Sequence, residues 1–261
     1  MTSTTQKNKN KRKIKIKIWA VAVWLVIWQA VSMWIGQEIL LVSPVTVLSA
    51  LVKLAAKSEF WLSIASSLLR IMGGFLLAVV TGTGLAALAA VSRRVREFLE
   101  PFIVTVKSIP VASFVILVLI WVSSRNLSVV ISFLMVFPII YTNVLDGISH
   151  MDVQLKEMAD VFQIPAMQRV RWIYLSQIMP FFRTGCSLGL GLCWKAGVAA
   201  EVIGIPQNSI GENLYNAKIY LDTAELFAWT IVIICISVFF EKGFLKLIDV
   251  LVKYLNSMDK R

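Results

Sequence analysis

The segment EMADVFQIPAMQRVRWIYLSQIMP, residues 157–180, carries mixed charge and lies between two long apolar runs. Its apolar and polar residues follow a helical spacing, which Pro165 interrupts. Because proline breaks a helix at or just before its own position, the segment predicts two short amphipathic helices. An ordered polar segment between two membrane-compatible runs indicates a face that is offered to a soluble partner.

The rest of the chain has the composition of a membrane protein. Of its 261 residues, 58% are hydrophobic and 16% are charged, and the mean hydropathy is +0.77. The charged residues are too few to cover the surface of a soluble domain of this size. The apolar residues form runs near the ~20 residues that cross a bilayer, which predicts an all-α bundle. The last run is short, and we expect it to continue about two turns beyond its apolar part. The six expected transmembrane helices are Ile18–Ile35, Ile71–Val91, Phe102–Val122, Leu127–Leu145, Phe181–Ile203 and Leu226–Phe240.

Positive charge is distributed unevenly over the predicted loops. Of the 26 Lys and Arg residues, 19 fall in the N-terminal tail, the second and fourth loops and the C-terminal segment, whereas 4 fall in the opposite loops. This bias marks the cytoplasmic side, so both termini are predicted to be cytoplasmic, and the net charge of +11 reports topology rather than nucleic-acid binding. We expect a basic tail at residues 1–17, a membrane domain at 18–255 with a cytoplasmic loop at 150–180, and a short tail at 256–261.

Two local signals predict how helices begin and pack. Ser43 followed by Pro44 is typical of a helix start and indicates a short amphipathic helix on the outer side. Gly74, Ala78 and Gly82 recur every four residues, and such a stripe of small residues lets helix backbones approach closely in lipid. The second predicted span therefore belongs at the centre of the bundle.

Two prolines lie within predicted spans. Pro110 falls in the third span and Pro138 in the fourth, and each removes a hydrogen-bond donor from its helix. We expect a kink or an opening at both positions, which would serve either packing or a moving gate.

A few ionisable residues lie in or near the predicted spans, where charge is costly and is usually functional. Arg70 and Asp146 fall at span ends and could reach the headgroups. Lys107 lies about a turn and a half from the cytoplasmic side, and Lys195 lies deeper, with Glu201 six residues beyond it. Lys195, Glu201 and Lys107 are our candidates for a translocation path, although Lys195 would equally suit the bundle core.

The residue patterns of enzymes are missing from this sequence. Glycine is nowhere followed by lysine, which excludes a phosphate-binding Gly-x-x-x-x-Gly-Lys-[Ser/Thr] loop, and neither Gly-x-Ser-x-Gly nor His-Glu-x-x-His occurs. Cys186, Cys193 and Cys235 have no disulfide or metal spacing, and His150 is the only histidine. We expect no catalytic residues, no metal site and no cofactor, and any ATP hydrolysis must come from another chain.

The polar segment resembles the loop that defines the permeases of binding-protein-dependent ABC importers. That pattern is Glu-Ala-Ala, three residues, Gly, and a proline about a dozen residues later. Glu157, Ala159 and Pro180 match it, whereas Met158 replaces the second residue and Gln163 replaces the glycine. The loss of glycine puts the sharp turn of the family in doubt here.

The resemblance extends over residues 42–254 and is similar to the nitrate, sulfonate and taurine branch. Seven further motifs occur in the expected order: Ser43-Pro44-Val45-Thr46, Ser67-Leu68-Leu69-Arg70 before Gly74-Phe75, Ser108-Ile109-Pro110-Val111-Ala112, Phe137-Pro138, Gly147 before the loop, Ala199-Ala200-Glu201, and Ile210-Gly211 followed by Asp222.

The resemblance implies a type I ABC importer permease with separate partners. The loop would dock into cytoplasmic ABC ATPase subunits, an extracytoplasmic solute-binding protein would deliver the solute, and a second permease copy would complete the path as a homodimer. By the same resemblance, the ATPase-coupling residues are Glu157, Ala159, Phe162, Gln163, Ile164 and Arg169.

The sequence thus predicts a multi-pass protein of a bacterial plasma membrane that carries a small, anionic solute of the nitrate, sulfonate or taurine type. An ATP-independent secondary transporter or channel is the alternative, and an intramembrane enzyme or scaffold is a third class. An adjacent ATPase gene and a secreted binding protein would distinguish the importer from the first of these. Hydrolytic activity in the isolated chain would favour the intramembrane enzyme.

Overall fold

A computed structural model describes residues 18–257 of the chain, and every regular element in that range is helical. The predicted basic tail at residues 1–17 and most of the tail at 256–261 lie outside the described range. In chain order the elements are α1 (Ile18–Ile35), α2 (Pro44–Ala55), α3 (Ser58–Val91), α4 (Arg93–Ser108), α5 (Val111–Val118), α6 (Ser124–Ser149), α7 (Val153–Val161), α8 (Ala166–Arg169), the π-helix η1 (Val170–Tyr174), α9 (Leu175–Gly204), α10 (Ile210–Ile219) and α11 (Thr223–Ser257).

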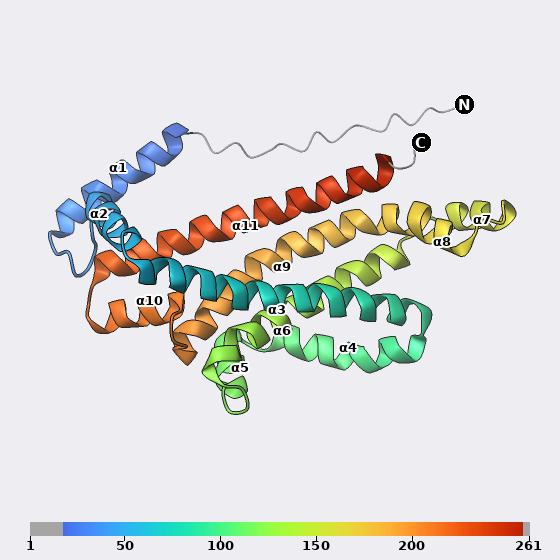
Figure 1. Cartoon of the computed structure of the whole chain (residues 1–261), viewed down its shortest axis with the longest axis horizontal. Coiled ribbons are helices and arrows are strands. Elements are labelled where there is room, and N and C mark those ends of the chain that lie inside the picture. The colour runs from blue at the N-terminus through green and yellow to red at the C-terminus, as the bar shows by residue number, and fades with distance from the viewer. Residues whose placement is uncertain (1–17, 258–261) are drawn as a thin grey trace.

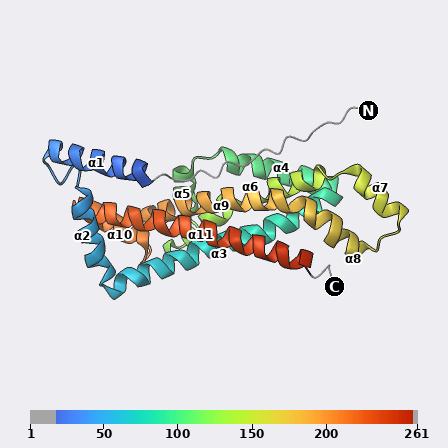
Figure 2. The same cartoon turned by 90° about the horizontal axis from the view of Figure 1, so that it is seen from above.

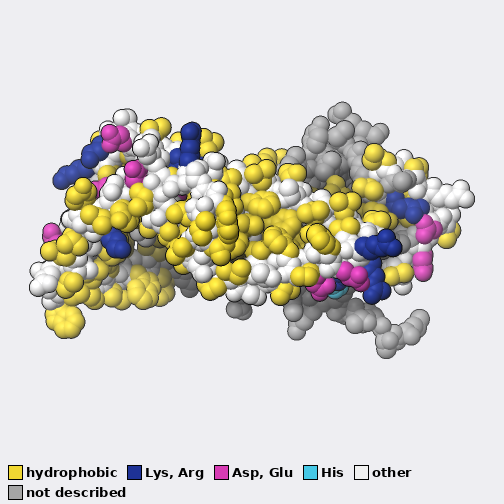
Figure 3. All heavy atoms as spheres, turned by 90° about the horizontal axis from the view of Figure 1, so that it is seen from below, with side chains coloured by type: hydrophobic (Ala, Val, Ile, Leu, Met, Phe, Trp, Pro, Cys, Tyr) yellow, Lys and Arg dark blue, Asp and Glu magenta, His cyan; other side chains and the backbone are white. Residues whose placement is uncertain are grey.

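Four long helices, α3, α6, α9 and α11, run along the long axis of the molecule (Figures 1 and 2). All four are long and apolar enough to cross a membrane, and α4 with α5 would add a fifth if the bent pair forms one span. Hydrophobic side chains cover the middle of the molecule, whereas charged side chains gather near its two ends (Figure 3). This distribution is the one that a bilayer imposes.

The predicted six spans are thus recovered in part. The last span continues well beyond Phe240, as expected, because α11 extends to Ser257. Helix α1 coincides with the first predicted span but is shorter than the four long helices, and the topology of six crossings stays a prediction.

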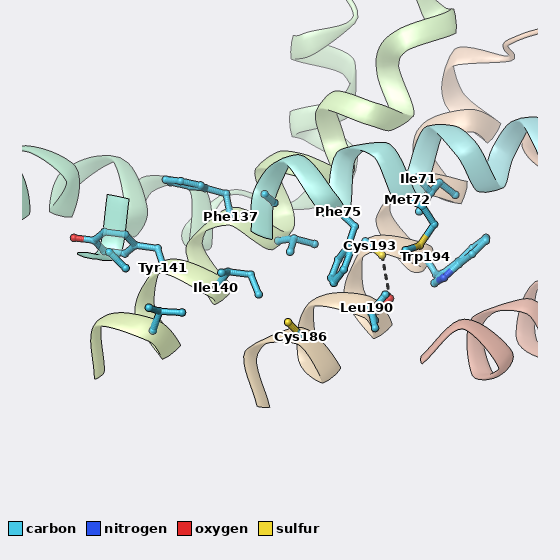
Figure 4. Packing of buried hydrophobic residues seen from close by; sticks show 14 of the residues in the cluster. Ile71, Met72, Phe75, Phe137, Ile140, Tyr141, Cys186, Leu190, Cys193 and Trp194 are labelled. Carbon is cyan, nitrogen blue, oxygen red and sulfur yellow. Dashed lines mark hydrogen bonds between the residues drawn. The ribbon is translucent and has the colours of Figure 1, made fainter. Parts of the chain in front are cut away.

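The centre of the bundle is formed by α3, α6 and α9, which confirms the predicted role of the small-residue stripe. Gly74, Ala78 and Gly82 are all buried. A Cβ atom on Gly74 would lie 2.3 Å from the carbonyl oxygen of Val129 on α6, so only glycine permits this approach. Around this contact, aromatic, aliphatic and cysteine side chains of the three helices form the main hydrophobic core (Figure 4).

The two intraspan prolines behave differently. At Pro110 the chain bends by 110° between α4 and α5, so the third predicted span is broken rather than kinked. At Pro138 the helix α6 continues without a break. The hydroxyl of Thr142 donates to the carbonyl oxygen of Pro138 at 2.6 Å, within an otherwise intact helix that is packed on both α3 and α9.

A second group of helices closes the end of the bundle opposite α7 and α8 (Figure 1). Ser43 caps α2 by accepting a hydrogen bond from the backbone N–H of Thr46 at 3.2 Å, as the Ser-Pro pattern predicted. Residues from α2, α3, α10 and α11 pack there as a separate apolar cluster around Trp229. The segment that joins α9 to α10 is thereby held against several helices at once.

Candidate functional site

The segment between α6 and α9 forms two helices and a turn, as the sequence predicted. Asp152 caps α7 by accepting from the N–H of Gln154 at 2.9 Å, and the side chain of Gln177 on α9 accepts from the N–H of Asp152 at 3.0 Å. After the turn, α8 runs through η1 directly into α9. The second short helix is therefore the beginning of the long α9 rod, so the predicted start of the fifth span at Phe181 lies within a continuous helix.

The turn itself is made by Gln163, at the position where the family pattern has glycine. Gln163 has a left-handed backbone with φ of 48°. The N–H of Ile164 donates to the carbonyl of Ala159 at 3.0 Å, and the N–H of Gln163 donates to that of Asp160 at 3.1 Å. These two bonds form the helix-ending motif that normally uses glycine in the left-handed position. The sharp turn is therefore preserved despite the substitution, at the cost of backbone strain.

Arg169 fastens the two short helices together. Its guanidinium Nη1 lies 2.5 Å from the carboxylate of Asp160, and Nη2 donates to the carbonyl oxygens of Ala159 at 3.2 Å and Ile164 at 3.4 Å. The carbonyl of Ala159 belongs to the C-terminal end of α7, where a positive charge is favourable, and that of Ile164 belongs to the turn that follows. Asp160 is largely exposed, while Arg169 is mostly covered. The segment is thus a single clasped unit.

The outer surface of this unit is apolar and is not covered by the rest of the chain. Val161 is 78% exposed, Phe162 is 73% exposed and Met167 is 80% exposed. The acidic side chain of Glu157 is exposed on the same segment. We name these four residues, with Gln163, the docking surface. Of the remaining predicted coupling residues, Ala159 is fully buried, Ile164 is half-buried, and Arg169 acts within the unit.

The three predicted path residues occupy different surroundings. Lys195 is exposed on α9, so it does not belong to the bundle core. Lys107 is exposed at the end of α4, and its Nζ donates to the hydroxyl of Thr142 at 2.9 Å. Neither lysine has a carboxylate oxygen within 4.0 Å among residues 18–257. Glu201, by contrast, is fully buried.

The expectation that Glu201 lines a path is corrected by its contacts. The hydroxyl of Ser67 donates to Glu201 Oε2 at 2.6 Å, and the N–H of Gly211 donates to the same oxygen at 3.3 Å. Arg70 Nη1 lies 3.7 Å from Glu201 Oε1. A buried carboxylate is tolerated only when it is paired and hydrogen-bonded, as here. Glu201 therefore links α9 to α3 and α10.

This link belongs to a larger set of contacts made by one stripe of α3. Ser66 donates to the carbonyl of Asn208, Ser67 accepts from the N–H of Ile210 at 2.9 Å, and Arg70 Nη2 donates to the carbonyl of Gln207 at 3.1 Å. One turn earlier, the hydroxyl of Ser63 accepts from the side-chain amide of Asn213 at 3.0 Å. We call these contacts the polar clamp, formed by Ser63, Ser66, Ser67, Arg70, Glu201 and the segment 207–213.

Sequence reasoning did not identify the polar clamp. The signal was present, because the pattern Ser63-x-x-Ser66-Ser67-x-x-Arg70 places four polar side chains on one helix face. Gly211 completes the clamp, since a Cβ at that position would lie 2.3 Å from the Cβ of Glu201. Only glycine lets α10 approach α9 this closely.

Further polar contacts join the inner end of α9 to α11. Arg183 forms two bonds with the carboxylate of Asp249, at 2.7 and 3.1 Å, and the hydroxyl of Ser187 donates to Glu241 at 2.8 Å. Within the described part of the chain, no group of three or more His, Cys, Asp or Glu side chains could hold a metal ion.

The fold defines the class of polytopic helical membrane proteins, with clasped short helices at one end and a clamped loop at the other. Residues 74–256 match the family described as the binding-protein-dependent transport system inner membrane component. Because the match covers most of the chain, this protein belongs to that family. It is the membrane-spanning permease subunit of an ABC importer, and ATP is hydrolysed on a separate subunit.

Several curated permeases are similar to this chain over most of its length. One is named as an aliphatic sulfonates transport permease, SsuC of Bacillus subtilis, and is 26% identical over 91% of this chain and 87% of its own length. The taurine transport system permease TauC of Escherichia coli is 27% identical over 85% of this chain and 83% of its own. The bicarbonate transport system permease CmpB of Synechococcus elongatus is 25% identical over 56% of this chain and 53% of its own.

Proposed function

We propose that this permease crosses a bacterial plasma membrane six times, pairs with a second copy of itself and carries a small anion inwards. Both termini would then lie in the cytoplasm with the α7–α8 unit, and the polar clamp would lie at the outer face. The observation that carries the proposal is the docking surface, an uncovered apolar surface on a polar segment. The names of the relatives, which refer to sulfonates, taurine and bicarbonate, support a small anionic or zwitterionic solute.

The docking surface is covered neither by lipid nor by the rest of the chain, and this supports coupling to the ATPase. Phe162 and Met167 are exposed on the α7–α8 unit, which lies at one end of the molecule (Figure 1), and charged side chains gather near that end (Figure 3), so lipid tails are not available to cover them. Large apolar side chains in that position gain free energy when a partner's groove buries them. Arg169 and Gln163 would fix the shape of the surface, and Glu157 would add a charged contact at its edge.

A path for the anion is supported by the two unpaired lysines. Lys195 lies on the fifth predicted span, where a charge facing lipid is costly. Its side chain is exposed and without a carboxylate partner among residues 18–257, so an aqueous path is the environment that suits it. Lys107 lies nearer the cytoplasmic end and would meet the same solute later. The two copies would place four such charges around one path.

Transport would follow from rigid motion of clasped units. Binding of ATP would close the ATPase subunits, and the docking surface would move with them. Because α8 continues through η1 into α9, that movement reaches the whole α9 helix. The permease would then alternate between inward and outward openings without forming or breaking a covalent bond.

The coupling role is tested with Glu157→Lys in the assembled importer, reconstituted in liposomes with its ATPase and binding protein. We expect solute-stimulated ATP hydrolysis to fall several-fold, because the charge at the edge of the docking surface is inverted. Glu59→Lys, an equally exposed site at the opposite end of the molecule, is the matched control and should leave hydrolysis unchanged. Normal stimulation in Glu157→Lys, with correct membrane insertion, would contradict the docking role.

The solute and the path are tested together by uptake. Liposomes are assayed with labelled taurine, an alkanesulfonate and bicarbonate, using Lys195→Ala and Lys195→Arg. We expect Lys195→Ala to reduce uptake by at least tenfold and Lys195→Arg to retain most of it, because the positive charge is what the path requires. Equal uptake in all three proteins would show that Lys195 lies away from the path.

A further inference from the structure

A cavity of about 530 Å³ lies at the clamped end of the bundle, outside the docking surface and apart from the two path lysines. It is bounded by α3, by the beginning of α6 and by the segment that joins α9 to α10. Most of the residues in its wall have polar or charged side chains. The residues that matter for its chemistry are Arg70, Ser123, Ser124, Arg125, Gln207 and Asn208.

The wall of this cavity carries positive charge and no carboxylate. Arg70 forms its inner side, but the charge of Arg70 is balanced by Glu201 at 3.7 Å. Arg125 is exposed and forms no ion pair with any carboxylate of residues 18–257. Arg125 therefore supplies the net charge, while Arg70 adds fixed N–H donors. Guanidinium groups with neighbouring hydroxyls are suited to oxyanions, which they bind with several bonds at once.

The beginning of α6 adds partial positive charge to the wall of the cavity. Ser123 precedes this 26-residue helix, but its side chain makes no capping bond, and the first turn contains no acidic residue. The first N–H groups of a long helix carry partial positive charge. The hydroxyls of Ser123 and Ser124 lie in the cavity wall beside Arg125, so the helix start reinforces a field that Arg125 already sets.

The opposite wall is rigid. Ile205 and Asn208 both have left-handed backbones, with φ of 47° and 53°, and the polar clamp holds this segment on α3. Ser66 donates to the carbonyl of Asn208, and Arg70 donates to that of Gln207. A cavity whose wall is already ordered loses little entropy when a ligand binds, which favours small ligands.

We propose that this cavity, the outer vestibule, binds a small oxyanion through Arg125 and the Ser123–Ser124 hydroxyls. A sulfonate, a carboxylate and a lipid phosphate share the chemistry that these groups recognise, and the occupant we infer is the free anion. The inference rests on the proposed function, because the vestibule would receive the solute at the outer face before Lys195 does. Arg125 is then a specificity-determining residue, which selects anions at the entrance to the path.

The vestibule is tested by charge-selective thiol modification, which needs no transport. Ser124→Cys is introduced with Cys235→Ser, which leaves Cys186 and Cys193 as buried thiols. The reagents are a sulfonate-bearing and a trimethylammonium-bearing methanethiosulfonate of similar size, applied to the permease in phosphatidylcholine nanodiscs. We expect the ratio of the anionic to the cationic rate at Ser124→Cys to exceed that at Ser49→Cys by about tenfold, the lower end of electrostatic focusing in a cleft. Ser49 is an exposed serine on α2 at the same end of the molecule and serves as the matched control.

Arg125 and the source of the anion are tested in the same assay. Arg125→Gln should abolish the preference and Arg125→Lys should retain most of it, and soluble methanesulfonate should slow modification of Ser124→Cys. Equal ratios at the two cysteines, or a ratio unaffected by Arg125→Gln, would overturn the proposal. Protection by phosphatidylglycerol nanodiscs but not by methanesulfonate would assign the site to lipid headgroups instead. This assay is independent of the uptake assay. A charge preference at Ser124→Cys together with no anion uptake would therefore refute the proposed solute and leave the vestibule proposal standing.

Discussion

The α9 helix ends at both sides in a turn built from left-handed residues other than glycine, yet the two turns are held in opposite ways. At the end that the proposed topology places on the inner side, Gln163 lies on the surface, and the pair of the mostly covered Arg169 with the exposed Asp160 closes the turn. At the outer side, Ile205 follows the fully buried Glu201. The inner turn is held at the surface, whereas the outer turn is held from within the bundle.

The difference separates a unit whose apolar surface is left uncovered from a turn that is anchored in the buried part of the bundle. Ion pairs that are open to solvent on one side contribute little free energy, so opening the inner turn costs little. A buried charge that loses its partner is strongly destabilising, so opening the outer turn costs much more free energy. The following substitutions test this contrast, beginning with the one of largest expected effect.

Removing the buried carboxylate should be the most damaging change. In Glu201→Ala, Arg70 loses its counter-charge, and the hydroxyl of Ser67 and the N–H of Gly211 lose their acceptor. We expect the free energy of unfolding to fall by about 3–5 kcal/mol, measured by denaturant titration of the purified permease in mixed micelles. Glu59→Ala, which removes an exposed carboxylate of α3, should change it by less than about 0.5 kcal/mol. Equal effects of the two variants would refute the buried clamp.

The close approach of α10 to α9 predicts a smaller loss. In Gly211→Ala the new Cβ would lie 2.3 Å from the Cβ of Glu201, so the two helices must separate. We expect a loss of about 1–3 kcal/mol in the same titration. Gly243→Ala on α11 is the control, because nothing lies within 4 Å of its added Cβ, and it should be neutral or stabilising. A neutral Gly211→Ala would show that the outer turn yields as easily as the inner one.

At the inner turn, Arg169→Ala should have a local effect. It removes the bonds to Asp160 and to the carbonyls of Ala159 and Ile164, which together are worth about 1–2 kcal/mol. We expect faster amide hydrogen exchange over residues 153–169 and an unchanged exchange rate in α3 and α6. Arg93→Ala, which breaks an exposed pair with Glu97, provides the comparison, and its effect should be below about 0.5 kcal/mol. Faster exchange throughout the bundle would contradict a locally closed unit.

The smallest expected effect is a gain in stability. Gln163→Gly would relieve a left-handed strain of about 1–2 kcal/mol, offset in part by the greater freedom of glycine in the unfolded chain. We expect a net stabilisation of about 0.5–1 kcal/mol, read as slower hydrogen exchange at the end of α7. Gln168→Gly, within the helical segment α8, should have the opposite sign. Destabilisation by Gln163→Gly would indicate that the glutamine side chain holds the turn.

Much of the fold could be predicted because local signals and packing agree. Pro44 after Ser43 begins a helix, Pro165 separates two short helices, and the Gly74–Gly82 stripe lies in the buried contact between α3 and α6, as expected. The exposure of the segment between α6 and α9 could be expected from its polarity, since a charged segment between apolar runs must leave the membrane, whereas its docking role stays a prediction. Membership of the permease family was predicted from motif order and is confirmed by the matching family model.

The remainder depended on tertiary contacts that a linear pattern does not contain. Pro110 and Pro138 give the same local signal, but Pro138 lies on α6, whose contacts with α3 and α9 are far more extensive than those of α4 or α5 with their neighbours, and α6 stays intact. Glu201 is a path candidate by sequence because it is an ionisable residue in a predicted span, and the sequence does not show that Ser67 on α3 and Gly211 on α10 bind it. Gln163 adopts the conformation of the glycine it replaces, because neighbouring bonds impose it.

The uninterrupted course from α8 through η1 to the end of α9 also determines how far the molecule reaches. Residues 166–204 form one rod of about 58 Å at 1.5 Å per residue, whereas a whole bilayer with its headgroups measures about 40–45 Å. When the Glu201 end of an upright rod is level with the headgroups of one leaflet, the opposite end stands about 15 Å clear of the headgroups of the other. An ATPase could then bind that protruding end outside the bilayer, without displacing lipid.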